Sequence, residues 1–265
     1  MTRAQRSLIR KDMGEVLKQK QTRLPLLIVP LMLGVFLPAF FTVLCLWIPP
    51  EEVSAGEMDA LMRFMPQWVQ SLNPRVLTYY MMMNVLIPML LLMIPMMSGS
   101  VFAAGSFVGE KERKTLETLL YAPISTRQVF TAKVGAGLGL AMLVTWVSGL
   151  LAAAIYAVGM FLIMGTFSLP PVAWWIILLV VAPGVALVGL TVTVMVSAKA
   201  ETANEATQKA SLLVLPLVLL AVGQFTGLFF LTPVLLLGIG VVFLAAGLLL
   251  MRITAQNFTA EKVLK

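Results

Sequence analysis

Long apolar runs dominate this sequence, and polar residues are confined to the shorter stretches between them. Five runs contain no charged residue and are long enough to cross a bilayer as helices. They are Leu24 to Ile48, Met81 to Val108, Val134 to Met164, Val172 to Ala198 and Ala210 to Met251. The last run is about twice the length that a ~30 Å hydrocarbon core requires. Because Gly223, Gly227 and Pro233 interrupt it, we divide it in two and predict six spanning helices.

The composition supports this pattern. Hydrophobic residues make up 60% of the 265 residues and charged residues 12%, whereas an average soluble domain carries roughly 25% charged residues. We therefore expect an all-α integral membrane protein with one transmembrane domain over residues 1–265. The first apolar run is too long for the core of a signal peptide and lacks a small-residue cleavage site, so we expect no cleaved leader.

Basic residues indicate the orientation, because Lys and Arg near helix ends are retained in the cytoplasm. Six spans place both termini on one side. That side holds 17 of the 19 basic residues, and the other side holds only Arg63 and Arg75. We therefore expect a multi-pass protein with both termini in the cytosol. The net charge of +7 then reflects membrane topology and gives no reason to expect a nucleic acid partner.

The first 23 residues predict an amphipathic helix. Leu8, Ile9, Met13, Val16 and Leu17 share one side, and most basic residues lie elsewhere. This pattern is typical of a helix that lies in the headgroup layer with its apolar face toward the lipid. A solvated basic tail is the alternative.

A charged segment, GEKERKTLETLLYAPIS from Gly109 to Ser125, lies between the second and third apolar runs. It begins with consecutive charges at 110–114, continues with Leu116, Leu119 and Leu120, and meets a helix-ending proline at Pro123. Pairs of opposite charge four residues apart favour a helix of about three turns. Such a helix can seat in a groove of another protein, or its leucines can rest on the bilayer; the residues alone leave both interpretations open.

The sequence lacks the residues that several kinds of catalytic and transport site require. The chain has no His, and we expect no ionisable group or carboxylate to be buried in the membrane, where proton-driven and ion-driven carriers usually place them. We therefore predict no catalytic residue and no metal site. The phosphate-binding pattern GxxxxGK[ST] is also absent, so ATP would have to be bound by another polypeptide.

Two further sets of residues are candidates for a transport function. The second run carries methionines along one stripe, which suggests a substrate path or plain packing; they are Met82, Met89, Met93 and Met96. In the same run, Pro88 and Pro95 are expected to bend the helix. The long last run contains residues that either form a re-entrant outer gate or a simple loop between two spans; they are Gly223, Gln224, Gly227 and Pro233.

The charged segment resembles the signature of the type-2 ABC exporter permeases, and within them it is most similar to the Nat-type branch. That signature is a run Glu-x-Glu-Arg-x-x-Thr-Leu-Glu-x-Leu-Leu, followed by a proline and a small hydroxyl residue, between the second and third spans. The matching residues here are Glu110, Glu112, Arg113, Thr115, Leu116, Glu117, Leu119, Leu120, Pro123 and Ser125.

The resemblance implies a function and partners. The chain would be the transmembrane subunit of an ATP-driven exporter in a prokaryotic plasma (inner) membrane, without enzymatic activity of its own. Two permease copies, as a homodimer, would enclose the path, and two ABC ATPase subunits would bind ATP and Mg²⁺. Residues 109–125 would form the coupling helix that each ATPase subunit receives. The resemblance does not identify the cargo.

Two other classes of function compete with an exporter. One is an ATP-independent membrane scaffold or sensor whose charged loop binds a regulatory partner. The other is a secondary carrier driven by an ion gradient, which the expected lack of buried ionisable groups argues against.

Overall fold

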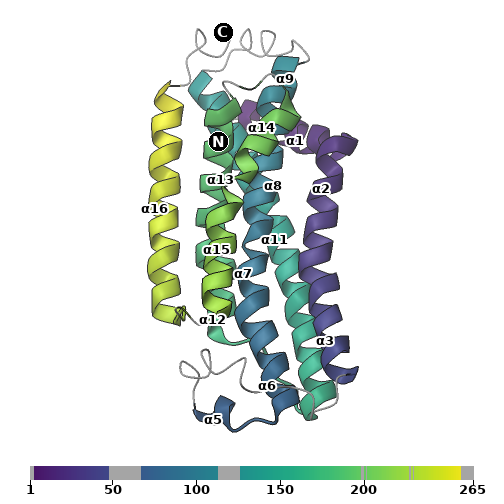
Figure 1. Cartoon of the computed structure of the whole chain (residues 1–265). Coiled ribbons are helices and arrows are strands. Elements are labelled where there is room, and N and C mark those ends of the chain that lie inside the picture. Colours follow the sequence, from purple (N-terminus) through teal and green to yellow (C-terminus); the bar gives the residue numbers. More distant parts are fainter. Residues whose placement is uncertain are drawn as a thin grey trace.

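The computed structural model describes residues 3–47, 67–112, 126–197, 200, 202–226, 228 and 230–257. Within these residues it is a bundle of long helices whose charged connections gather at one end (Figure 1). We call this end, where helices α1 (Arg3–Lys18), α9 (Gly109–Glu112) and α14 (Ala203–Ser211) lie, the charged end. The prediction of an all-α membrane fold is confirmed.

Six helical stretches are long and apolar enough to span a membrane, as predicted. They are Thr22–Trp47, Pro74–Val108, Gln128–Met164, Val172–Ser197, Ala203–Gln224 and Pro233–Gln256. The first consists of α2 (Lys20–Leu31), η1 (Met32–Phe36) and α3 (Leu37–Trp47), where η marks a wide π-helical turn. The second consists of α6 (Pro74–Met81), η4 (Met82–Leu86), α7 (Ile87–Leu91), α8 (Met93–Ala103) and η5 (Ala104–Val108).

The remaining spans are less interrupted. The third is the single helix α11 (Thr126–Met164), and the fourth consists of α12 (Val172–Ile176), η6 (Ile177–Val181) and α13 (Ala182–Ser197). The fifth joins α14 to α15 (Val214–Phe225), and the sixth is α16 (Pro233–Asn257). A one-turn helix, α5 (Gln67–Gln70), precedes the second span.

Prolines account for three of the four wide turns. η1, η4 and η6 each end two residues before a proline, at Pro38, Pro88 and Pro183. A proline has no N–H for the carbonyl four residues earlier, and its ring displaces that carbonyl, so the preceding turn widens. The second span is interrupted again at Leu92, three residues before Pro95. Both prolines therefore follow an irregular turn of this span, and the predicted bend stays a prediction.

The second and fourth spans form the centre of the bundle. Their most apolar windows are 78% and 67% buried, whereas the window of the sixth span is only 17% buried. The main apolar core joins Met89 and Met96 of the second span to Val181 and Val185 of the fourth and to Leu217 of α15. Figure 1 shows the first and sixth spans at opposite edges, where their exposed apolar side chains face outward.

Glycines permit the closest helix contacts. A Cβ at Gly184 of α13 would lie 2.7 Å from the Leu244 backbone nitrogen of α16, so only glycine allows this approach. In α11, a Cβ at Gly137 would lie 2.4 Å from a Leu190 methyl group, whereas one at Gly139 would meet nothing within 4 Å.

The N-terminal helix is present as predicted, but its apolar side contacts protein. Val16 is buried, and Ile9 and Met13 pack with it against Phe102 of α8 and Leu140 of α11. The expectation that this face points into the lipid headgroups is therefore wrong for these three side chains. These contacts bind α1 to α8 and α11.

Candidate functional site

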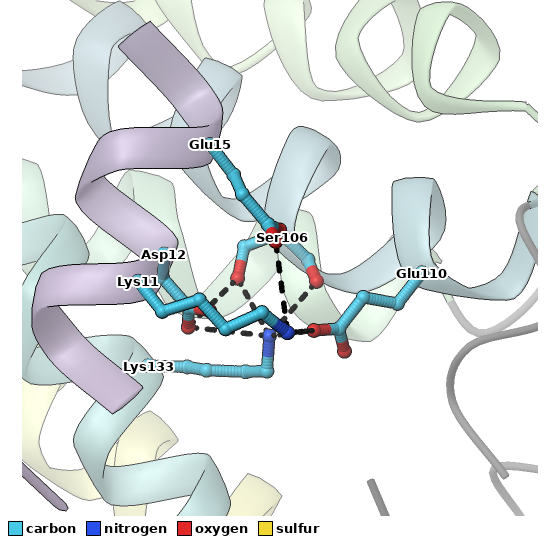
Figure 2. Close-up of polar contacts among 6 residues, drawn as sticks. All are labelled: Lys11, Asp12, Glu15, Ser106, Glu110 and Lys133. Atoms are coloured by element: carbon cyan, nitrogen blue, oxygen red, sulfur yellow. Dashed lines mark hydrogen bonds and ion pairs between the residues drawn. The ribbon is translucent and has the colours of Figure 1, made fainter. Parts of the chain in front are cut away.

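A buried charge cluster lies at the charged end, where four segments meet. We call it the Lys133 cluster, and it consists of Asp12 of α1, Ser106 of η5, Glu110 of α9 and Lys133 of α11. Figure 2 shows the side chains of Asp12, Ser106 and Glu110 around the Lys133 ammonium, with the Lys11 ammonium beside it in this view and joined by dashed lines to Glu110 and Glu15. The exposed fractions of Lys133, Asp12 and Glu110 are 1%, 2% and 5%.

The lysine ammonium is surrounded by oxygens. Lys133 Nζ lies 3.0 Å from Glu110 Oε1 and 3.3 Å from Asp12 Oδ2. It donates to the Ser106 hydroxyl at 2.9 Å and to the Ser106 carbonyl at 3.0 Å, and the same hydroxyl donates to Asp12 Oδ2 at 3.4 Å. An ammonium has only three hydrogens, so the four oxygens share them. The centroid of the Phe107 ring also lies 5.4 Å from Lys133 Nζ, which allows a cation–π interaction.

The buried part of the Lys133 cluster contains two carboxylates and one ammonium. Asp12 and Glu110 share the one buried cation, Lys133, while the half-exposed Lys11 lies 4.0 Å from Glu110 and 3.7 Å from Glu15. Burial raises the pKa of the Asp12 carboxyl, and Lys133 opposes this increase. Glu110 faces into the protein rather than toward solvent.

This geometry corrects two expectations from the sequence. Lys133 is one of the 17 basic residues counted on the cytosolic side and directly precedes the apolar run that begins at Val134, yet it lies in α11 and within the candidate span Gln128–Met164. The prediction that no ionisable group is buried in the membrane is contradicted by Lys133, which is buried within a candidate span, whereas Asp12 and Glu110 are buried outside the candidate spans. Lys133 forms an ion pair with each of the two carboxylates, so the buried charges are paired within the protein.

Most of the predicted coupling residues lie outside the described residues. Glu110 and Glu112 belong to α9, and only the Glu110 side chain is described. The remainder fall in the range 113–125; they are Arg113, Thr115, Leu116, Glu117, Leu119 and Leu120. Their role stays a prediction.

The methionine stripe is largely a packing feature. Met89 and Met96 are buried in the main core against the fourth span and α15. Met82 and Met93 are partly exposed. A substrate path along all four residues stays a prediction, and the contacts of Met89 and Met96 favour the packing interpretation.

The predicted outer gate coincides with a turn between two helices. Gly223 and Gln224 end α15, Pro233 begins α16, and Gly227 lies outside the described residues. The Gly223 carbonyl accepts from the Leu228 N–H at 3.0 Å and the Thr226 hydroxyl at 3.2 Å, which closes the helix end. The side-chain carbonyl of Gln224 is buried with no hydrogen-bond partner among the described residues. These bonds favour a simple loop.

Sequence reasoning missed Asp12, Ser106 and Lys133, although signals were present. Asp12 lies on the apolar face of its helix, between Ile9 and Val16, where a carboxylate requires a buried partner. Lys133 directly precedes a long apolar run and follows the apolar pair Val129 and Phe130, both of which are buried. Pairing the two residues required the fold, since 120 positions separate them in the sequence.

Comparison with known proteins identifies the family. The sequence pattern of the family described as "ABC-2 family transporter protein" matches residues 6–234. A comparison with curated proteins found no match. The matched range contains five complete candidate spans, the Lys133 cluster and the segment 109–125. The chain therefore belongs to the ABC-2 family of transporter proteins and is a transmembrane subunit of an ABC transporter.

Proposed function

We propose that this chain is the membrane subunit of an ATP-driven exporter, and that residues 109–125 couple it to separate ATPase subunits. The observation that carries the proposal is the position of this segment. It begins in α9, directly after the central second span, and the chain returns to the bundle at α11. A displacement of the segment would therefore act on a central helix, whose most apolar window is 78% buried.

The proposed assembly contains two copies of this chain and two ATPase subunits, which bind ATP and Mg²⁺. The charged end faces the cytosol of a prokaryotic cell, because most basic residues lie in the segments that meet there. The resemblance of the charged segment to the Nat-type branch supports export as the direction. The residues proposed to contact the ATPase are Glu112, Arg113, Thr115, Leu116, Glu117, Leu119 and Leu120.

The test replaces single residues of the segment in the complex. The chain and its ATPase subunit are co-purified, and ATPase activity is measured in lipid vesicles for Glu112→Ala and Leu119→Asp. The proposal predicts that both variants lower coupled ATPase activity while the spans still insert. Leu228→Asp is the matched control, because Leu228 is 78% exposed in the turn at the far end of α15. Wild-type activity in both segment variants would overturn the coupling role.

A scaffold or sensor function makes a different prediction. In that case no ATPase subunit co-purifies with the wild-type chain, and the charged segment captures a partner in the absence of nucleotide.

A further inference from the structure

The coupling segment is closed at its base by an ion pair. Glu110 lies in α9, near the start of the coupling segment 109–125, and Lys133 lies in α11, eight residues after the end of the segment. Their charged atoms, Glu110 Oε1 and Lys133 Nζ, are 3.0 Å apart. One buried ion pair therefore joins the start of the segment to the helix that follows it, and a force on the start of the segment acts on both residues.

A third charged residue extends this contact to the N-terminal helix. Asp12 Oδ2 of α1 lies 3.3 Å from the same Lys133 ammonium, and the Ser106 hydroxyl donates to that Asp12 oxygen. Apolar contacts of Ile9, Met13 and Val16 hold the rest of α1 against α8 and α11. The base of the segment, α1 and α11 therefore share one polar centre.

Burial makes this centre resistant to separation. At 1% exposure, Lys133 cannot replace a lost carboxylate with water without opening the packing around it. Separating Glu110 from the ammonium would also break an ion pair between two buried groups. If α1, α9 and α11 move as one unit, the ion pairs of Lys133 are preserved, and if these helices separate, the ion pairs break.

We propose that Lys133 is the positioning residue that ties the base of the coupling segment to α1 and α11, so that nucleotide-driven movement of the segment carries both helices with it. The inference rests on the proposed function, since it needs an ATPase that moves the segment. It also assigns Glu110 a different role from the other signature residues: Glu110 binds Lys133 inside the bundle, and residues after it meet the ATPase.

Glu110→Gln is the informative variant. It removes the charge that joins the segment to Lys133 and leaves Asp12 and Lys133 as a balanced pair. Glu110→Asp is the conservative variant, because it keeps a carboxylate at the position that faces Lys133. Glu205→Gln is the matched control, because it breaks the pair with Lys209 at the same end of the bundle, where both side chains are more than one third exposed.

The readout is the movement of α1 relative to α16. Spin labels are placed at the exposed positions Lys18→Cys and Arg252→Cys in a Cys45→Ala background, where Cys45 is the only native cysteine. The complex with its ATPase is studied in vesicles without nucleotide and with trapped ATP and Mg²⁺. Labelled copies are diluted with excess unlabelled copies, so that each distance comes from one chain.

The proposal predicts that ATP shifts the distance distribution in the unaltered cluster and in Glu205→Gln. Glu110→Gln should lower the ratio of shifted to unshifted molecules by about tenfold, a usual size for coupling between sites. Glu110→Asp, which keeps the charge, should retain most of the shift. Two results would overturn the role of Lys133 but not the proposed function. One is a shift in Glu110→Gln as large as in the unaltered complex, and the other is no shift in the unaltered complex while its ATPase hydrolyses ATP. Failure of any ATPase to bind the chain would overturn the proposed function instead.

Discussion

Removing the ammonium of Lys133 should destabilise the bundle far more than removing either carboxylate that it binds. Lys133→Met keeps the length of the side chain but leaves Asp12 and Glu110 buried without their shared cation. Asp12→Asn and Glu110→Gln each leave one carboxylate facing one ammonium. The three variants therefore delete one charge each from the same cluster with different consequences.

The magnitude follows from the distances. At 3.0 Å and 3.3 Å, and with an effective dielectric constant of about 20, each ion pair contributes about 5 kcal/mol of gross attraction. Desolvation of the buried ions, several kcal/mol each, offsets most of this in the intact cluster. In Lys133→Met both carboxylates are still desolvated, but the attraction to the ammonium is gone. We therefore expect the free energy of unfolding to fall by about 3–5 kcal/mol. Asp12→Asn should cost about 1 kcal/mol, the scale of an ordinary hydrogen bond.

Cys45 provides the assay. It is the only cysteine in the chain and is 2% exposed, so a thiol-reactive fluorogenic dye labels it when the bundle opens. In detergent, Lys133→Met should melt roughly 10 °C below wild type, from about 2–4 °C per kcal/mol for chains near this size. Lys209→Met is the control for an exposed pair, which contributes about 0–1 kcal/mol. Melting of Lys133→Met within 2 °C or so of that control would refute the reasoning.

Three further results are expected. Gly184→Ala should destabilise by about 1–3 kcal/mol, because its Cβ would meet the α16 backbone at 2.7 Å, whereas Gly139→Ala, with nothing within 4 Å, should not, and the same dye assay compares them. Because the pKa of Asp12 is raised in the folded protein, the stability of the wild type should fall as pH rises from 3.8 through that pKa. The melting temperature of Asp12→Asn should therefore increase relative to that of the wild type over this pH range. A difference in melting temperature that does not change with pH would contradict the raised pKa. In vesicles, Leu119→Asp should lower coupled ATPase activity and Leu228→Asp should not, and equal activities would contradict a coupling role.

The spans and their interruptions could be predicted from the sequence, because their causes are local. Charge-free apolar runs define the six helices, and each of three prolines follows a wide turn that ends two residues before it. The division of the last run at residues 226–232 also follows from local breakers such as Pro233, which begins α16.

The Lys133 cluster could not be predicted from local patterns. Counting charges by segment placed Lys133 outside the apolar runs on the cytosolic side, because a cation beside an apolar run usually marks a helix end. Its burial depends on α1 folding back across the bundle and bringing Asp12 to it. Likewise, the apolar side of α1 was predicted correctly as a surface for burial, but whether lipid or protein covers it depends on which helices lie beside it.

The most direct test of the central claim is to find what the coupling segment touches during ATP turnover. A photoreactive amino acid at Leu119, in the assembled complex in native membranes, should crosslink to the ATPase subunit, and the yield should change when ATP is trapped. The same group at Leu228 should not reach that subunit. Crosslinks from position 119 to lipid alone, while the ATPase is present and hydrolysing ATP, would contradict the account.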